Sequence, residues 1–163
     1  MTQMLDDLLA RLNALPAKTK EQVVKDAQQA TKGLVVVPNT GPQTAAYLSE
    51  ADVLLFGGSP GGGKTVLELA LGINDTHYRA LIVRKSFTDL EGLIDTAKKL
   101  VGSDDRFVGG MRPKYRKPNG GVIHFAGVAG DGGIGGHQGV DHDLICIDEA
   151  AQIPEKQVRL LLG

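Results

Sequence analysis

Apolar residues in this chain repeat with helical spacing in some segments and form short continuous runs in others. Near the start, leucines at i, i+3, i+4 and i+7 predict an amphipathic helix over residues 5–12. A second, more polar helix is predicted over residues 19–31. We therefore distinguish an N-terminal helical segment, residues 1–33, from the remainder, residues 34–163. Packing on the main domain is the simpler role for this segment, and partner binding is the alternative.

Beyond this segment, short apolar runs alternate with helical patterns. Buried strands are predicted at 53–56, 80–83 and 144–147, and helices follow the first two, at 66–71 and 90–101. This alternation is typical of an α/β fold, in which helices cover both faces of a mostly parallel sheet. The other expected elements are an extended stretch at 35–42, a short helix at 43–50, a hairpin at 114–125 turning at Asn119-Gly120, a glycine-rich loop at 127–139 and a last helix at 155–162.

The glycine-rich segment after the first predicted strand carries the strongest chemical signal. Residues 57–65 read Gly-Gly-Ser-Pro-Gly-Gly-Gly-Lys-Thr and fit G-x-x-x-x-G-K-[ST], the phosphate-binding loop of P-loop nucleotidases. Backbone N–H groups here can point together at phosphate oxygens, and the following helix adds its positive end. We expect Lys64 to reach the β- and γ-phosphates and the Thr65 hydroxyl to bind Mg²⁺. The expected nucleotide-binding residues of the loop are Gly58, Gly61, Gly62, Gly63, Lys64 and Thr65.

The apolar run at 144–147 ends in two acidic residues, Asp148 and Glu149. A buried strand that ends in aspartate fits the Walker B element, so Asp148 is expected to bind Mg²⁺ together with Thr65. The adjacent carboxylate of Glu149 can accept a proton from, or orient, an attacking water. Its presence favours ATP hydrolysis by strand-separating or translocating machinery over GTPase chemistry.

Composition narrows the cellular setting of the chain. Its 163 residues suffice for one domain with a core, and its net charge of −1 means that any nucleic-acid contact must be local. The single cysteine, Cys146, suits a reducing compartment and is interpreted as a core residue. Apolar runs are too short to span a membrane, and the acidic start argues against a signal peptide. We therefore expect a cytoplasmic protein without a membrane partner.

Four features together resemble the ATPase domain of phage terminase large subunits, the motors that pump viral DNA into capsids. Gly41-Pro42-Gln43 resembles the adenine-reading glutamine element, and residues 57–65 resemble the phosphate loop. Arg84-Lys85 is similar to the basic pair that ends the family's second strand. Gln138-Gly139, which leads through Asp141-His142-Asp143 into residues 144–150, resembles the family's approach to its Walker B strand.

The resemblance covers roughly residues 34–163 and implies a P-loop NTPase fold of the additional-strand ATPase type, with ATP and Mg²⁺ as cofactors. It implies double-stranded DNA, the small terminase subunit and the portal as partners, and a homo-oligomeric ring of full-length motors in the host bacterial cytoplasm. Family members continue past this length into the ATP-coupling strand, the rest of the motor domain and a nuclease domain. We therefore expect a fragment whose sheet is incomplete at the C-terminus, without the strand that normally lies between the Walker A and Walker B strands.

In this interpretation three residues have catalytic roles: Lys64, Arg84 and Glu149. Arg84 is the candidate for stabilising transition-state charge; a surface or salt-bridge role is the alternative, and a neighbouring subunit is another source of arginine. Gln43 would read adenine, because an amide both donates to and accepts from its edge. Two other functions stay open: a different DNA-translocating or helicase-type P-loop ATPase, and an inactive remnant that binds nucleotide without turnover.

Two further groups of residues need an interpretation. Residues 106–117 hold basic side chains, Tyr115 and no acid, which makes them a candidate strip for tracking DNA phosphates, with a solvated hairpin as the alternative. The histidines lack metal-ligand spacing with a cysteine and are interpreted as ordinary residues. The basic residues of the strip are Arg106, Arg112, Lys114, Arg116 and Lys117, and the histidines are His77, His124, His137 and His142.

Overall fold

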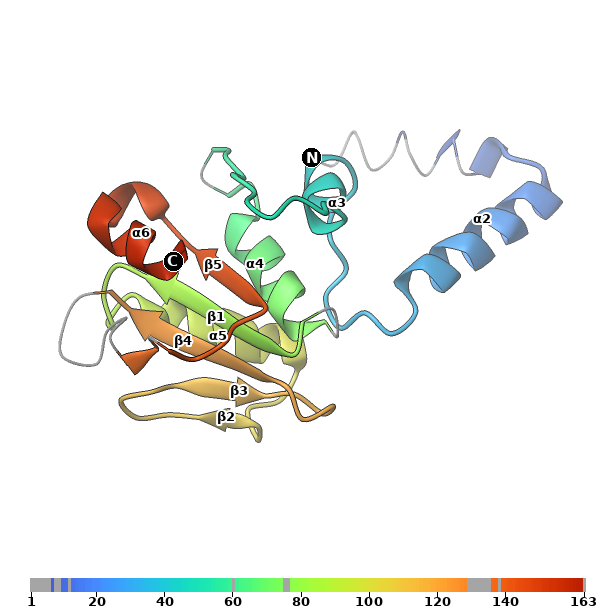
Figure 1. The fold of residues 1–163 in the computed structure, drawn as a ribbon. Helices are drawn as coiled ribbons and strands as arrows, with labels where there is room; N and C mark the ends of the chain where they lie inside the picture. The colour runs from blue at the N-terminus through green and yellow to red at the C-terminus, as the bar shows by residue number, and fades with distance from the viewer. Residues whose placement is uncertain are drawn as a thin grey trace. The chain divides into compact units, whose positions relative to one another are not determined.

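A computed structural model describes residues 7, 10–11, 13–59, 61–74, 77–128, 136–137 and 139–162 of the chain. The chain divides into two compact units, Met1–Leu34 and Val35–Gly163. In the first unit, helix α2 spans Ala17–Thr31 (Figure 1), so the helix predicted over residues 19–31 is confirmed with an earlier start. The leucines of the helix predicted at 5–12 lie outside the described residues.

The second unit is built on a five-stranded mixed sheet with the order β2-β3-β4-β1-β5 (Figure 1). Strand β1 pairs in parallel with both β4 and β5, whereas β3 pairs antiparallel with both β2 and β4. The expectation of a mostly parallel sheet is therefore wrong for the β2-β3-β4 side, where short connections, residues 109–113 and the Asn119-Gly120 turn, join consecutive strands that run in opposite directions. The strands are β1 Arg79–Arg84, β2 Phe107–Val108, β3 Lys114–Arg116, β4 Val122–Gly127 and β5 Leu144–Ile147.

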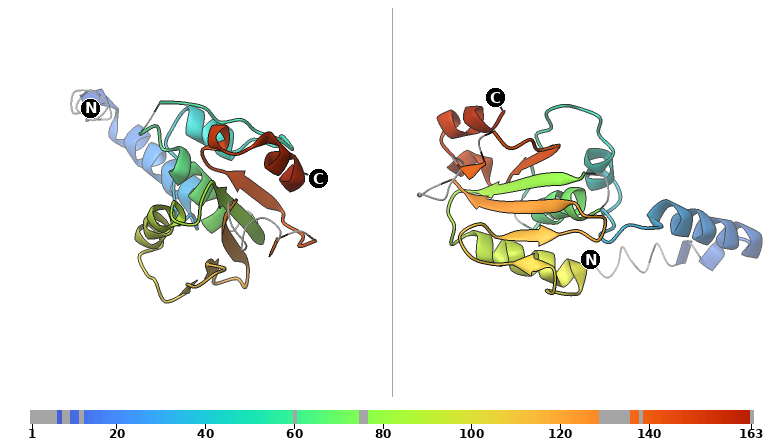
Figure 2. Two further views of the ribbon diagram at one scale, coloured as in Figure 1. Left: turned by 90° about the vertical axis from the view of Figure 1, so that its left-hand side faces the viewer. Right: turned by 60° about the horizontal axis from the view of Figure 1, so that its bottom comes forward.

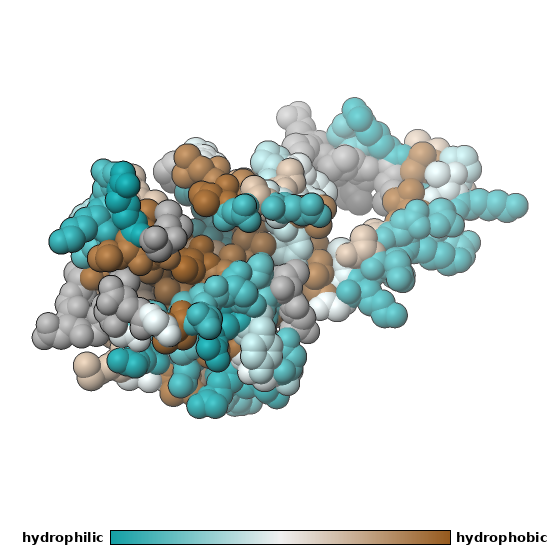
Figure 3. Space-filling model, viewed as in Figure 1, coloured by the Kyte–Doolittle hydropathy of each residue, from teal (hydrophilic) through white to brown (hydrophobic). Residues whose placement is uncertain are grey.

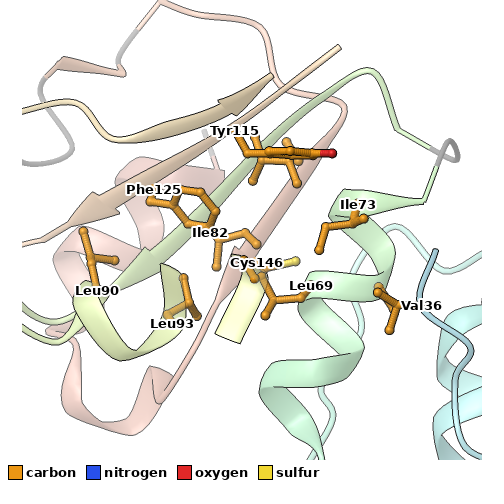
Figure 4. Packing of buried hydrophobic residues seen from close by; sticks show 13 residues of the cluster. Val36, Leu69, Ile73, Ile82, Leu90, Leu93, Tyr115, Phe125 and Cys146 are labelled. Atoms are coloured by element: carbon orange, nitrogen blue, oxygen red, sulfur yellow. The ribbon is translucent and has the colours of Figure 1, made fainter. Parts of the chain in front are cut away.

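Helices cover both faces of this sheet (Figure 2), as the sequence predicts. On one face, Leu69 of helix α4 and Leu93 of helix α5 share a core with Phe125 of β4 (Figure 4). On the other face, Val158 of helix α6 packs in a smaller cluster with Leu81 of β1. Because β1 contributes to both clusters, its central residues are buried on both sides, as expected for a middle parallel strand. The helices are α3 Pro42–Tyr47, α4 Lys64–Ile73, α5 Leu90–Val101 and α6 Glu155–Leu162, with a 3-10 helix, η2, at Ala150–Gln152.

The strand predicted at residues 53–56 is absent from the described part of the sheet. Residues 49–59 adopt neither helix nor strand, and the side chains of Val53 and Leu55 are 72% and 89% exposed. Figure 3 shows hydrophobic residues (brown) at the surface among hydrophilic ones, and Val53 and Leu55 belong to the exposed apolar residues of the described chain. Strand β5 is an edge strand of the sheet, and residues 53–56 are not paired with it or with any other described strand. The prediction is therefore wrong for this structure, because a strand without a hydrogen-bonded neighbour is not stable.

The predicted hairpin at 114–125 is confirmed as β3 and β4, and Gly120 in its turn has a φ of +88°. Strand β2 was not predicted, and the glycine-rich loop at 127–139 lies mostly outside the described residues. Among the helices that the structure describes, none has both the length and the apolar character needed to cross a membrane.

Lys117, at the end of the hairpin strand, has an unexpected environment. Its side chain is 2% exposed, and its Nζ donates to the backbone oxygens of Gly72 (3.0 Å), Asn74 (2.8 Å) and His77. The lysine thus closes the C-terminal end of α4, where carbonyl groups lack partners within the helix. The inclusion of Lys117 in a DNA-tracking strip is therefore wrong, because its charge does not reach the surface.

Candidate nucleotide site

The glycine loop leads directly into α4, which begins at Lys64. Gly63, the residue before the helix, has a left-handed backbone with φ 74° and ψ 21°, and Gly61 also has a positive φ of 78°. The N–H of Gly62 donates to the Ser59 oxygen at 3.2 Å, which tightens the turn. These conformations favour glycine and curl the loop at the N-terminus of a ten-residue helix, where free N–H groups attract anions.

The Lys64 side chain folds back over this loop. Its Nζ donates to the backbone oxygens of Gly58 at 2.9 Å and Ser59 at 3.0 Å. The ammonium is therefore held at the glycine loop itself, on the segment expected to bind phosphates. An ammonium group in this position places a positive charge beside the free N–H groups of the helix.

The two halves of the predicted site meet at Asp148. The Thr65 hydroxyl, in the first turn of α4, donates to Oδ2 of Asp148 at 3.2 Å. Arg84 donates to the same oxygen from Nε at 2.9 Å and from Nη2 at 2.6 Å. Arg84 ends β1 and Asp148 follows β5, and because these strands are parallel neighbours, their carboxyl ends lie at one edge of the sheet. Arg84 thus has the salt-bridge role that the sequence left open as an alternative.

Gln43 connects helix α3 to the glycine loop. It is 4% exposed, and its Nε2 donates to the Gly63 oxygen at 2.8 Å. Its Oε1 accepts the N–H of Asn39 at 2.7 Å. Both ends of the amide therefore make hydrogen bonds inside the protein, and because the side chain is buried, reading adenine requires it to become accessible.

Glu149 has an uncommon backbone conformation. Its φ is 54° and ψ is 42°, and it is the sole non-glycine residue with positive φ in the described part of the chain. Its carboxylate is exposed and accepts a hydrogen bond from Gln152 Nε2 at 2.8 Å. A left-handed conformation costs a residue with a Cβ atom about 1 kcal/mol, and such strain concentrates at functional sites.

Replacing Glu149 with glycine is expected to stabilise the protein by about 0.5–1 kcal/mol relative to the Glu149→Ala variant. Both variants lose the carboxylate, but only glycine relieves the left-handed strain. Urea unfolding of the two variants measures the difference. A glycine variant that unfolds at the same or lower urea concentration than the alanine variant contradicts the assignment of strain to this position.

Glu68 is a residue of this site that the sequence analysis missed. Its Oε2 atom is buried without a hydrogen-bond partner. Burial raises the pKa of this carboxyl to about 8, with a further contribution from the charge of Asp148 and opposition from Arg84. The available signal was its spacing, because a residue four positions after Lys64 and three after Thr65 shares their side of the helix.

The donor atoms fit a magnesium ion that is bound together with phosphates. Mg²⁺ prefers oxygen ligands and usually takes only one or two from the protein, and Thr65 and Asp148 offer a hydroxyl and a carboxylate within 3.2 Å of each other. Among the described residues, no three His, Cys, Asp or Glu side chains are placed to hold a metal ion by themselves. A magnesium site here therefore depends on phosphate oxygens and water for its other ligands.

The structure thus brings Lys64, Thr65, Arg84 and Asp148 to one edge of the sheet, with Gln43 behind the loop. Glu149 follows directly in the sequence, but its carboxylate is hydrogen-bonded to Gln152. No protein-family model, curated protein or solved structure matches the chain. The interpretation of this site therefore depends on its own residues and geometry.

Proposed function

We propose that this chain is a P-loop nucleotide-binding protein that takes ATP with Mg²⁺. The observation that carries the proposal is the 3.2 Å contact between Thr65 and Asp148, residues 83 positions apart in the sequence. It joins the glycine loop to the acidic end of β5, the pairing that a magnesium nucleotide requires. Lys64 and the N–H groups of residues 61–65 would bind the phosphates, for which the N–H of Gly62 has to leave the Ser59 oxygen. Thr65 and Asp148 would hold Mg²⁺, which neutralises phosphate charge when bound.

Within this class we propose a motor ATPase resembling the phage terminase large subunit, which couples ATP hydrolysis to packaging of double-stranded DNA into a capsid. The support is the resemblance in sequence at Gly41-Pro42-Gln43, at residues 57–65, at Arg84-Lys85 and from Gln138-Gly139 to Asp148-Glu149. By the same resemblance, the small terminase subunit and the portal are the partners, and the full-length motor acts as a homo-oligomeric ring.

The proposed chemistry assigns a separate task to each residue around Asp148. Glu149 orients the attacking water or accepts its proton. Arg84, whose guanidinium already lies 2.6 Å from the Asp148 carboxylate, supplies positive charge at the site. Lys64 supplies a second positive charge from the glycine loop. For hydrolysis, the Glu149 carboxylate has to break its hydrogen bond with Gln152. The Arg84 guanidinium has to turn away from Asp148 before it can stabilise charge on the phosphate.

A second candidate function is nucleotide binding without turnover. It is favoured by the position of residues 53–56 outside the sheet, because the strand that normally fixes the glycine loop does not brace it here. The hydrogen bond from Gln152 to the Glu149 carboxylate also favours this candidate, because it holds the carboxylate that turnover requires. Binding requires only the loop and the Thr65–Asp148 pair, whereas turnover also requires a water positioned by Glu149.

Binding of a fluorescent ATP analogue tests the shared part of both candidates. The Lys64→Ala variant is expected to bind about 10- to 100-fold more weakly, since charge-assisted hydrogen bonds to phosphate contribute about 1.5–3 kcal/mol. The matched control is Lys99→Ala, which removes an exposed lysine from α5. Equal affinity of the Lys64→Ala variant and the unaltered chain would show that the loop does not bind nucleotide.

Phosphate release, with and without double-stranded DNA, then separates the two candidates. DNA-stimulated turnover that falls about 10²- to 10⁴-fold in Glu149→Gln, with binding retained, supports the motor. Binding without any turnover supports the second candidate and rejects hydrolysis by this chain.

A further inference from the structure

Three of the chain's four histidines come together on a part of the sheet that the nucleotide proposal does not use. His124 lies on β4, His142 precedes β5, and His137 lies between them in the sequence. The ring centroids are 5.4 Å apart for His124 and His137, and 5.9 Å apart for each of the other two pairs. His124 pairs in register with Leu81, three residues before Arg84, which separates the cluster from the nucleotide site by about 10 Å along the strand.

The histidine cluster, defined as His124, His137 and His142, contains ring nitrogens without partners. Nδ1 of His124 and both ring nitrogens of His142 are buried and make no hydrogen bond to the described protein atoms. Buried polar atoms are nearly always paired, because leaving them unpaired costs free energy. A ligand that accepts lone pairs from several imidazoles at once would satisfy this requirement.

The protonation of the cluster suits such a ligand. Burial is the main cause that lowers the pKa of all three imidazoles, and their proximity to one another contributes to lowering that of His124 to about 4. Neighbouring cations lower these pKa values further, namely Arg79, Arg112 and Lys114. At His142 the carboxylates of Asp141 and Asp143 oppose the shift. The imidazoles are therefore neutral at neutral pH, which is the form that binds metal ions.

We propose that His124, His137 and His142 form a binding site for a transition-metal dication, with Zn²⁺ as the reference ion. Three imidazoles bound to one tetrahedral Zn²⁺ at about 2.0–2.1 Å have ring centroids roughly 5 Å apart, slightly closer than in this cluster. Among the described residues no three side chains already have metal-binding geometry, so the rings must rotate and approach by a few tenths of an ångström. Imidazole nitrogen is a preferred ligand of Zn²⁺ and of its neighbours in the series.

The position of the three histidines favours a structural role for the ion, that of connecting neighbouring segments of the chain. Asp143, next to His142, accepts the backbone N–H groups of Tyr78 at 2.6 Å and Arg79 at 2.9 Å, which fixes the entry to β5. That carboxylate is occupied, so water or the exposed Asp141 would supply the fourth ligand. The ion would then tie His137 to β4 and to the start of β5. The nearby basic side chains limit the affinity, because they repel a dication.

Titration of tag-free protein with Co²⁺, followed by displacement with Zn²⁺, tests the site. We expect visible absorption typical of Co²⁺ bound by nitrogen ligands at a stoichiometry of one, and its loss on adding Zn²⁺. His124→Gln and His142→Gln are each expected to weaken binding at least about 100-fold, because each removes one of three ligands. His77→Gln, outside the cluster, is the matched control, and circular dichroism checks that each variant folds.

The alternative outcomes are decisive. Absence of binding at a large excess of either ion, or equal affinity in His142→Gln and the unaltered chain, overturns the proposal. His142 is partly exposed, so this variant decides the question if His124→Gln does not fold. Lys64→Ala is expected to bind Co²⁺ like the unaltered chain, which keeps the result independent of nucleotide binding.

Discussion

Replacing Lys117 with methionine is expected to lower the free energy of unfolding by about 3–5 kcal/mol, because three carbonyl groups, two of them in buried hydrogen bonds, lose their shared donor. Methionine keeps most of the apolar stem of lysine but has no N–H to offer the oxygens of Gly72, Asn74 and His77. The loss includes the desolvation penalty of each carbonyl left unpaired. Since these oxygens lie at and beyond the end of α4, the effect extends to the helix that carries the glycine loop.

Urea unfolding followed by circular dichroism measures this change. Lys99→Met is the matched control, because Lys99 is exposed on α5 and its removal is expected to change stability by less than about 0.5 kcal/mol. If Lys117→Met and Lys99→Met unfold at the same urea concentration, the buried hydrogen bonds of Lys117 contribute nothing to stability.

Local sequence patterns predicted the elements whose formation depends on residues that are close together in the sequence. The glycine-lysine-threonine motif predicted a glycine turn followed by a helix, although α4 begins at Lys64, earlier than the predicted range 66–71, and the hairpin follows from Asn119-Gly120. The contact of Thr65 with Asp148 was also predictable, because a helix N-terminus and a strand's carboxyl end meet at the same edge of an α/β sheet. For the loop and the hairpin, one short segment contains the information that its geometry requires, whereas the Thr65–Asp148 contact joins residues 83 positions apart and was predictable only from the general arrangement of an α/β sheet.

Features that depend on distant parts of the chain were not predictable in the same way. Residues 53–56 have the apolar composition of a strand, but strand formation depends on a neighbour that the segment itself does not specify. The contact between Lys117 and Gly72 spans 45 residues, and a lysine within a basic run gives no sign of burial. The histidine cluster likewise forms from β4 and the approach to β5, so spacing alone gives no indication of it.

Glu68 connects stability to pH near the proposed magnesium site. The ordinary pKa of a glutamate is 4.5, and burial raises that of Glu68 to about 8 in the folded chain. Below pH 4.5 the carboxyl is protonated in both states and imposes no penalty. Between pH 4.5 and 8 the unfolded chain ionises this group while the folded chain keeps its proton, so stability falls as pH rises. The loss reaches its full size above the folded pKa.

Glutamine cannot ionise, so Glu68→Gln is expected to remove this loss. The stability of the variant minus that of the unaltered chain is expected to be about 3–5 kcal/mol larger at pH 8.5 than at pH 4.5. Unfolding in urea at both pH values, without added metal, measures the double difference. Glu50→Gln, at an exposed position, is the control for the general effect of removing a charge. The lowered pKa values of the histidine cluster make stability rise with pH in the acid range. This contribution is the same in the variant and the unaltered chain, so it cancels in the double difference. A variant whose stability changes with pH as that of the unaltered chain does would show that Glu68 ionises as it does in the unfolded chain, so that burial does not raise its pKa.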